Sequence, residues 1–280
     1  MKKIVLFLLL LVGFISFAQN NYALAENYYR ESEYEKASQL YKKLYDKNPF
    51  NTTYLKRLIS CYQETNHFLK AENLLKTRLE KYPNLYYLNV LLGYNFERQQ
   101  KKEKAVLYYE KALKNIDTNP NYGGIVGSFF KENNALDYAL KAYEKTMLKN
   151  PNANYRFQIA RIYGEKGAFQ QMFEAYVDLV NTNENWTENV KRYVSLYITD
   201  DAKNENNILF KKTVLRKSVS QPKDVWNLLL SWLFSIQKEY GKALVQEKAL
   251  FQRNTSSLTN IIDLGTVSFE NKDFLSAKKC

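Results

Sequence analysis

Histidine and cysteine, two of the side chains most often used in catalysis, are few in this sequence of 280 residues, with one His and two Cys. His67 is the only histidine, so no second histidine can join it at a metal ion, and we expect it in a turn between two helices. Cys61 and Cys280 are the only cysteines and form no CxxC motif. Asp200 and Asp201 are typical of an inter-helix turn, and no GxSxG or phosphate-binding loop is present. We therefore expect a chain that is not an enzyme, with no catalytic residue, metal or cofactor.

A repeat in the sequence indicates the secondary-structure elements that position these side chains. Ala37, Ala71, Ala105 and Ala139 follow one another at intervals of 34 residues. When each alanine is counted as position 20, aliphatic residues recur at position 7 and aromatic residues at position 11. These residues are Leu24, Leu58, Leu92 and Val126, followed by Tyr28, Tyr62, Phe96 and Phe130. A regular interval of this length is typical of stacked supersecondary units.

The spacing inside one interval predicts two helices. Positions 4, 7, 8 and 11 lie on one helical face, and positions 20, 24 and 27 lie on one face of a second helix. Small residues at positions 8 and 20 let the two helices approach closely, and proline near position 32 ends the second helix. Such a helix hairpin cannot bury its apolar face alone, so neighbouring hairpins must stack.

This pattern resembles the tetratricopeptide repeat family, and the resemblance covers nearly all of the chain after its first residues. It implies an all-α fold, a right-handed superhelical solenoid of stacked antiparallel helix hairpins. The expected units are 19–51, 52–85, 86–119, 120–152, 153–185, 186–222, 223–257 and 258–280. The sixth is divergent, and we expect Tyr193, Leu196 and Tyr197 in its first helix. The eighth is truncated, which favours a fragment of a longer protein over a frayed natural end.

The N-terminus has the form of a bacterial secretory signal peptide. Lys2 and Lys3 precede an almost wholly apolar run from Ile4 to Phe17, and small residues favour cleavage after Ala18. The alternative is a membrane anchor, but the run is shorter than the roughly 18 residues that a span needs. We expect residues 1–18 to be removed, and the mature protein to be periplasmic or secreted, with no stable membrane anchor.

The charge balance is basic, with 41 Lys and Arg, 29 Asp and Glu, and a formal net charge of +12. Such a balance can indicate nucleic acid or an anionic surface as the partner. The lysines are spread along helix faces that we expect to be exposed, so we interpret them as solvated and expect no nucleic acid. An acidic peptide and lipopolysaccharide remain open as partners.

The family resemblance also implies a binding surface, because in that family the first helix of each hairpin lines a concave groove. The matching positions carry Tyr22, Lys56, Tyr87, Tyr94, Arg98, Phe157 and Arg161. Aromatic residues beside arginine are favoured at interface hot spots. The alternative is that some of these tyrosines only cover neighbouring helices. The clamp that some members use for the C-terminal carboxylate of heat-shock chaperones has no match in three adjacent units.

Our hypothesis from the sequence is a non-enzymatic scaffold of the bacterial cell envelope that binds a segment of a partner protein in the groove, within an envelope complex. One alternative is the N-terminal sensory or accessory region of a larger signalling protein or enzyme. A second alternative is a glycan-binding helical-repeat protein. The sequence does not identify the partner.

Overall fold

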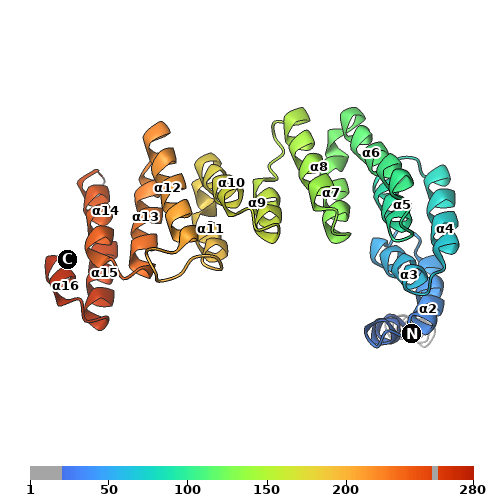
Figure 1. Ribbon diagram of the computed structural model, residues 1–280, viewed down its shortest axis with the longest axis horizontal. Coiled ribbons are helices and arrows are strands. Elements are labelled where there is room, and N and C mark those ends of the chain that lie inside the picture. Colours follow the sequence, from blue (N-terminus) through green and yellow to red (C-terminus); the bar gives the residue numbers. More distant parts are fainter. Residues whose placement is uncertain (1–20, 254–257) are drawn as a thin grey trace, which may run out of the picture. The chain divides into compact units, whose positions relative to one another are not determined.

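The computed structural model describes residues 21–253 and 258–280. The expected signal peptide at residues 1–18, with its cleavage point after Ala18, lies outside the described residues. The described chain is helical throughout and contains no strand (Figure 1). It forms two compact units, the first ending at Lys145 and the second beginning at Thr146.

The first unit consists of consecutive helix hairpins. Its helices are residues 21–30, α2 (Tyr34–Lys47), α3 (Thr52–Glu64), α4 (Phe68–Lys81), α5 (Tyr87–Glu97), α6 (Lys102–Thr118), the 3-10 turn η1 (Pro120–Tyr122), α7 (Gly123–Glu132) and the start of α8 (Leu136–Lys149). The second helices of successive hairpins, α2, α4, α6 and α8, begin 34 residues apart. The all-α hairpin architecture expected from the tetratricopeptide resemblance is therefore confirmed.

Two features of the repeat explain why each hairpin closes. The alanines at position 20 are buried, which brings the two helices together. The turn before each second helix contains a residue in the left-handed backbone region, at Ser32, Asn66, Gln100 and Asn134, with φ between 58° and 61°. Such a conformation is uncommon for a residue with a side chain, although asparagine tolerates it best. The repeat therefore extends to the backbone of its turns.

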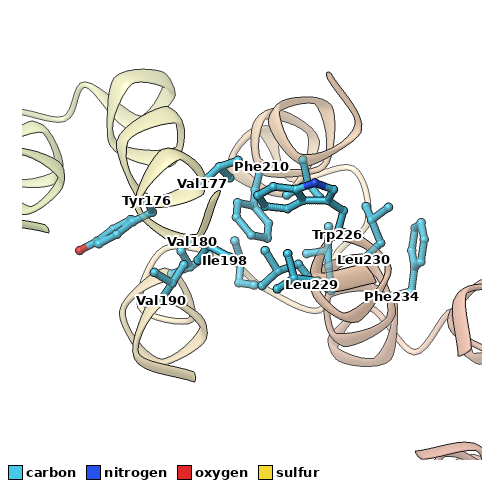
Figure 2. Packing of buried hydrophobic residues seen from close by; sticks show 14 of the residues in the cluster. Tyr176, Val177, Val180, Val190, Ile198, Phe210, Trp226, Leu229, Leu230 and Phe234 are labelled. Atoms are coloured by element: carbon cyan, nitrogen blue, oxygen red, sulfur yellow. The ribbon is translucent and has the colours of Figure 1, made fainter. Parts of the chain in front are cut away.

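The second unit continues with α9 (Arg156–Glu165), α10 (Phe169–Thr182), the 3-10 turn η2 (Glu184–Trp186), α11 (Thr187–Val194), α12 (Glu205–Ser220), α13 (Asp224–Ile236), α14 (Tyr240–Arg253), α15 (Thr259–Glu270) and α16 (Phe274–Lys279). Its core runs from α9 to α15 and includes Phe210, Trp226 and Leu229, which are all fully buried (Figure 2).

The divergent hairpin of this unit differs from our expectation. Helix α11 ends at Val194, so Leu196 and Tyr197 follow the helix instead of lying in it. The segment between α11 and α12 is held by the buried Asn207, whose amide nitrogen donates to the carbonyls of Thr199 and Asp201, at 2.7 Å each. These bonds tie the non-helical segment after α11 to the start of α12.

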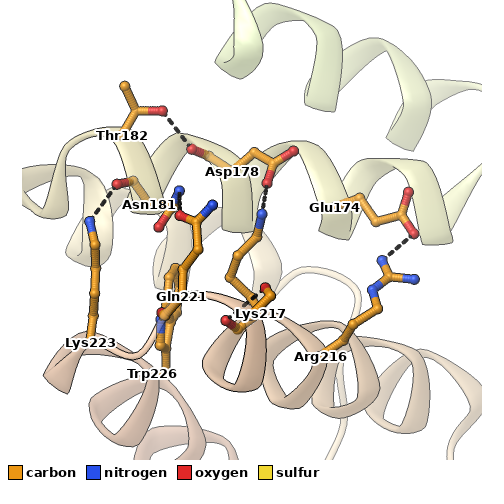
Figure 3. A network of polar contacts seen from close by, with 10 residues as sticks. Glu174, Asp178, Asn181, Thr182, Arg216, Lys217, Gln221, Lys223 and Trp226 are labelled. Atoms are coloured by element: carbon orange, nitrogen blue, oxygen red, sulfur yellow. Dashed lines mark hydrogen bonds and ion pairs between the residues drawn. The ribbon is translucent and has the colours of Figure 1, made fainter.

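A row of polar contacts joins α12 directly to α10 (Figure 3). Arg216 pairs with Glu174 at 2.6 Å, and Lys217 pairs with Asp178 one turn further along the two helices. These pairs are partly exposed, so each stabilises the contact by no more than about 1 kcal/mol. They fix the register of the two helices more than they add stability.

Within the described ranges, no helix is both long enough and apolar enough to cross a membrane.

Candidate partner-binding pocket

An open pocket of about 500 Å³ lies in the first unit. Its walls come from the first helices of four successive hairpins, namely residues 21–30, α3, α5 and the C-terminal end of α7. The side chains that shape it include Tyr29, Lys56, Arg57, Tyr94, Arg98 and Glu132. The pocket exists because consecutive hairpins place equivalent first-helix positions side by side.

Arg57 forms one end of the pocket through a two-point contact with Glu26. Its Nε lies 2.8 Å from Oε1 of Glu26 and its Nη2 lies 3.1 Å from Oε2, while the guanidinium lies 4.2 Å from the centre of the Tyr29 ring. Burial by itself would raise the pKa of Glu26, but hydrogen bonds from Tyr41 and Arg57 outweigh it and hold that pKa below its usual value. The arginine is thus held in place by a carboxylate and an aromatic ring.

Two further ion pairs cross the pocket between helices that are distant in sequence. Nζ of Lys56, on α3, lies 2.8 Å from Oε2 of Glu132, on α7, and 5.2 Å from the Phe129 ring centre. Nη1 of Arg98 lies 2.9 Å from Oε1 of Glu64, and this hydrogen bond raises the pKa of Arg98. Each of these three cations has a carboxylate partner, so the wall offers donors and acceptors in near-equal number and little net charge.

The structure brings together three of the seven residues expected in the groove. Lys56, Tyr94 and Arg98 all line the pocket. Tyr22 does not line it, and its ring packs against Tyr54 with 5.7 Å between centroids. Tyr87 is only 5% exposed, so this side chain is a packing residue and not the groove surface that we expected.

The burial of Tyr87 has a simple cause. Its ring centroid lies 4.5 Å from that of Phe129, which belongs to the next first helix, α7. Burial also raises the pKa of the Tyr87 hydroxyl. Tyr87 is therefore a packing residue between α5 and α7, as in the alternative that some of these tyrosines only cover neighbouring helices.

Phe157 and Arg161 lie in the second unit, on α9. Phe157 stacks on Trp186 with 5.4 Å between ring centroids and meets Tyr193 edge-on at 4.9 Å. The guanidinium of Arg161 lies 5.9 Å from the centre of the Tyr193 ring. These two expected residues therefore belong to a separate cluster between α9 and α11.

Sequence reasoning missed Arg57, Glu64 and Glu132 as pocket residues. A signal for two of them exists, because position 13 of the first four repeats carries charges of alternating sign. The four residues are Arg30, Glu64, Arg98 and Glu132. Opposite charges one repeat apart on neighbouring first helices are placed to pair, as Arg98 and Glu64 do.

Two of the residues singled out in the sequence, His67 and Cys61, have structural roles. His67 lies in the turn between α3 and α4, as expected, and its Nδ1 is 2.9 Å from the Thr65 hydroxyl oxygen. Cys61 is fully buried, and burial raises the pKa of its thiol to about 12, so it packs as an apolar residue. In the described ranges, no group of three His, Cys, Asp or Glu side chains is arranged to hold a metal ion.

No family model matches the chain. It is similar to the solved C-terminal part of a TPR repeat-containing protein from Cytophaga hutchinsonii, with 15% identity over 85% of this chain and 97% of that one and a TM-score of 0.34. A tetratricopeptide repeat protein from Parabacteroides merdae matches with 12% identity over 90% and 98% of the two chains and a TM-score of 0.32. The complex of Naa15 and Naa10 bound to HypK matches with 12% identity over 92% of this chain and 39% of that one, at a TM-score of 0.37.

Proposed function

We propose that this protein is a non-enzymatic interaction scaffold of the bacterial cell envelope, and that it holds a segment of a partner protein in the pocket of its first unit. The observation that carries the proposal is the pocket itself. First helices of four successive hairpins converge on one open cavity of about 500 Å³, whose lining contains aromatic rings and paired charges.

The chemistry of the pocket fits a polypeptide better than an apolar small molecule. Small-molecule sites are mostly apolar, with a few polar groups, whereas this wall is dominated by Lys, Arg, Glu, Gln and Ser side chains. A peptide backbone presents one donor and one acceptor per residue. Tyr29 and Tyr94 add the aromatic contacts that often supply most of the binding energy at protein interfaces.

The placement in the envelope is supported by the form of the N-terminus, with its basic start and short apolar run. N-terminal sequencing of the protein purified from its source cells tests this part. We expect the mature chain to begin at Gln19. A chain that retains its first 18 residues in the cytoplasmic fraction would contradict the envelope assignment but leave the scaffold role standing.

Site-specific photo-crosslinking tests the pocket directly. We place a photoreactive amino acid at Thr53, an exposed residue of the pocket lining, and in a control variant at Lys43, an exposed residue of α2 outside the pocket. In source cells, we expect a defined protein adduct from position 53 and none of the same mass from position 43.

The proposal also predicts that the yield of this adduct depends on the side chains of the pocket wall. Changing Tyr94 to Ala should reduce crosslinking from position 53, because the ring lines the pocket. Adducts of equal yield from both crosslinking positions, or an adduct that Tyr94→Ala leaves unchanged, would exclude this pocket as the binding site.

A further inference from the structure

Two arginines share one aromatic ring in the cluster between α9 and α11. The guanidinium carbon of Arg161, on α9, lies 5.9 Å from the centre of the Tyr193 ring, and that of Arg192, on α11, lies 5.6 Å from the same centre. Both side chains are exposed. Contact with an aromatic ring restricts a guanidinium in position without using its N–H donors for a strong hydrogen bond.

Neither of these arginines has a carboxylate partner in the described part of the chain. Arg192 donates one hydrogen bond, to the side-chain oxygen of Asn189 at 2.5 Å, and Arg161 makes only its ring contact. The pocket of the first unit differs in this respect, because Lys56, Arg57 and Arg98 are each paired with a glutamate. The cluster therefore presents two guanidinium groups with unused donors.

The aromatic rings of the cluster are occupied with one another. Phe157 stacks on Trp186, Tyr193 meets Phe157 edge-on, and Tyr193 also stacks on the buried Tyr176 with centroids 6.4 Å apart. The half-buried rings pack against one another, and the two exposed arginines add positive charge and hydrogen-bond donors to this surface.

From these observations we propose that Arg161 and Arg192 bind carboxylate side chains in an acidic segment of the partner protein. The inference rests on the proposed scaffold function and names the chemistry of a second contact. Guanidinium groups match carboxylates through two parallel hydrogen bonds, which are about twice as strong as those between neutral groups. The excess of Lys and Arg over Asp and Glu in the chain favours the approach of an acidic segment as well.

A binding titration with the full chain tests the inference. The probe is a short fluorescent peptide rich in glutamate, and the comparison probe carries glutamine in place of every glutamate. We expect the glutamate peptide to bind and Arg161→Gln or Arg192→Gln to weaken its binding about tenfold each, as loss of a charge-assisted hydrogen bond predicts. Higher salt should weaken binding further, because the site is exposed.

Arg216→Gln is the matched control, because it removes the same charge from an exposed arginine of the same unit that is already paired, with Glu174. It should change binding less than about twofold. Equal weakening by Arg216→Gln would show that only overall charge matters, and equal binding of the glutamine peptide would show that no carboxylate is recognised. Either result overturns the inference.

Two other probes separate the ligand classes. A single-stranded oligonucleotide or a sulfated polysaccharide that binds more tightly than the glutamate peptide, and loses affinity in the Arg161→Gln variant, would replace the acidic segment as the ligand. The crosslink from Thr53 in the first unit does not depend on these arginines, so the scaffold proposal and this inference can fail separately.

Discussion

Replacing Gly93 by alanine should destabilise the first unit, because the α5–α6 hairpin is closed by a contact that leaves no room for a side chain. A Cβ atom at Gly93 would lie 2.3 Å from both Cδ1 and Cε1 of Tyr109. Favourable contacts between carbon atoms are about 3.5–4.0 Å long. The tyrosine ring would have to move by more than about 1 Å to restore such a contact.

The surroundings of Tyr109 oppose that movement. The residue is 3% exposed, its ring lies 4.9 Å from the Tyr138 ring, and its hydroxyl donates a 2.6 Å hydrogen bond to Glu97. Overpacking of this kind costs roughly 1–3 kcal/mol, and weakening a hydrogen bond to a carboxylate adds up to about 1.5–3 kcal/mol. The better helix propensity of alanine returns about 1 kcal/mol. We expect a net loss of about 2 kcal/mol in the free energy of unfolding of this hairpin.

Native-state hydrogen exchange is the suitable assay, because a repeat protein does not have to unfold in a single step. Amides of α5 and α6 should exchange faster in the Gly93→Ala variant, while those of α13 and α14 keep their rates. Gly241, on α14, is the control position, since its Cβ would meet only the Ser276 hydroxyl, at 3.6 Å. Gly241→Ala should be neutral or stabilise by up to about 1 kcal/mol.

Two results would refute this reasoning. Unchanged exchange of α5 and α6 in the Gly93→Ala variant would mean that the hairpin accommodates the added methyl group without loss of stability. A loss of stability in Gly241→Ala as large as in Gly93→Ala would mean that glycine is needed for a reason other than space.

Three further predictions follow from single side chains. The ionised form of Glu26 is favoured in the folded state, so its contribution to stability is complete above the unfolded pKa near 4.5 and is lost as the pH falls below that value; acid titration by circular dichroism should show a smaller loss in a Glu26→Gln variant. Cys61 should resist a thiol reagent at pH 8 in the native protein while the exposed Cys280 reacts, and equal rates would contradict the tight core around Cys61. Asn207→Ala should cost about 1–3 kcal/mol and speed hydrogen exchange between α11 and α12, because the carbonyls of Thr199 and Asp201 lose the two hydrogen bonds from this side chain; unchanged exchange would show that the asparagine does not hold this segment.

The local structure of this protein was predictable because its determinants recur. The alanine at position 20 and the aliphatic residues at position 7 each act on helices that are adjacent in the chain. Every regular hairpin therefore closes through the same contacts between its two helices. The prediction of helix pairs followed from residues such as Ala71 and Ala105 without any long-range information. The prediction of helix pairs was less accurate in the sixth hairpin, where the regular pattern is replaced by a non-helical segment bonded to Asn207.

The candidate site was predictable only in part, for a physical reason. Lys56, Tyr94 and Arg98 could be placed because first-helix positions face one surface in every repeat. The glutamate partners of these residues could not be predicted in the same way, since Lys56 pairs with Glu132, which lies 76 positions further along the chain. Tyr87 shows the limit of position alone, because Phe129 covers its ring, whereas Thr53 at the equivalent position of the preceding repeat is exposed.

By itself, the sequence determined the hairpin, its 34-residue interval, the small residues that let helices touch and the absence of any familiar catalytic motif. Only the tertiary structure decided which charges are paired and which are free. In the pocket of the first unit, Lys56, Arg57 and Arg98 each pair with a glutamate. In the cluster between α9 and α11, Arg161 and Arg192 have only aromatic contacts and one hydrogen bond to an amide. The reason is that a repeat specifies each helix and its nearest neighbour, whereas ion pairing depends on distances between side chains several helices apart.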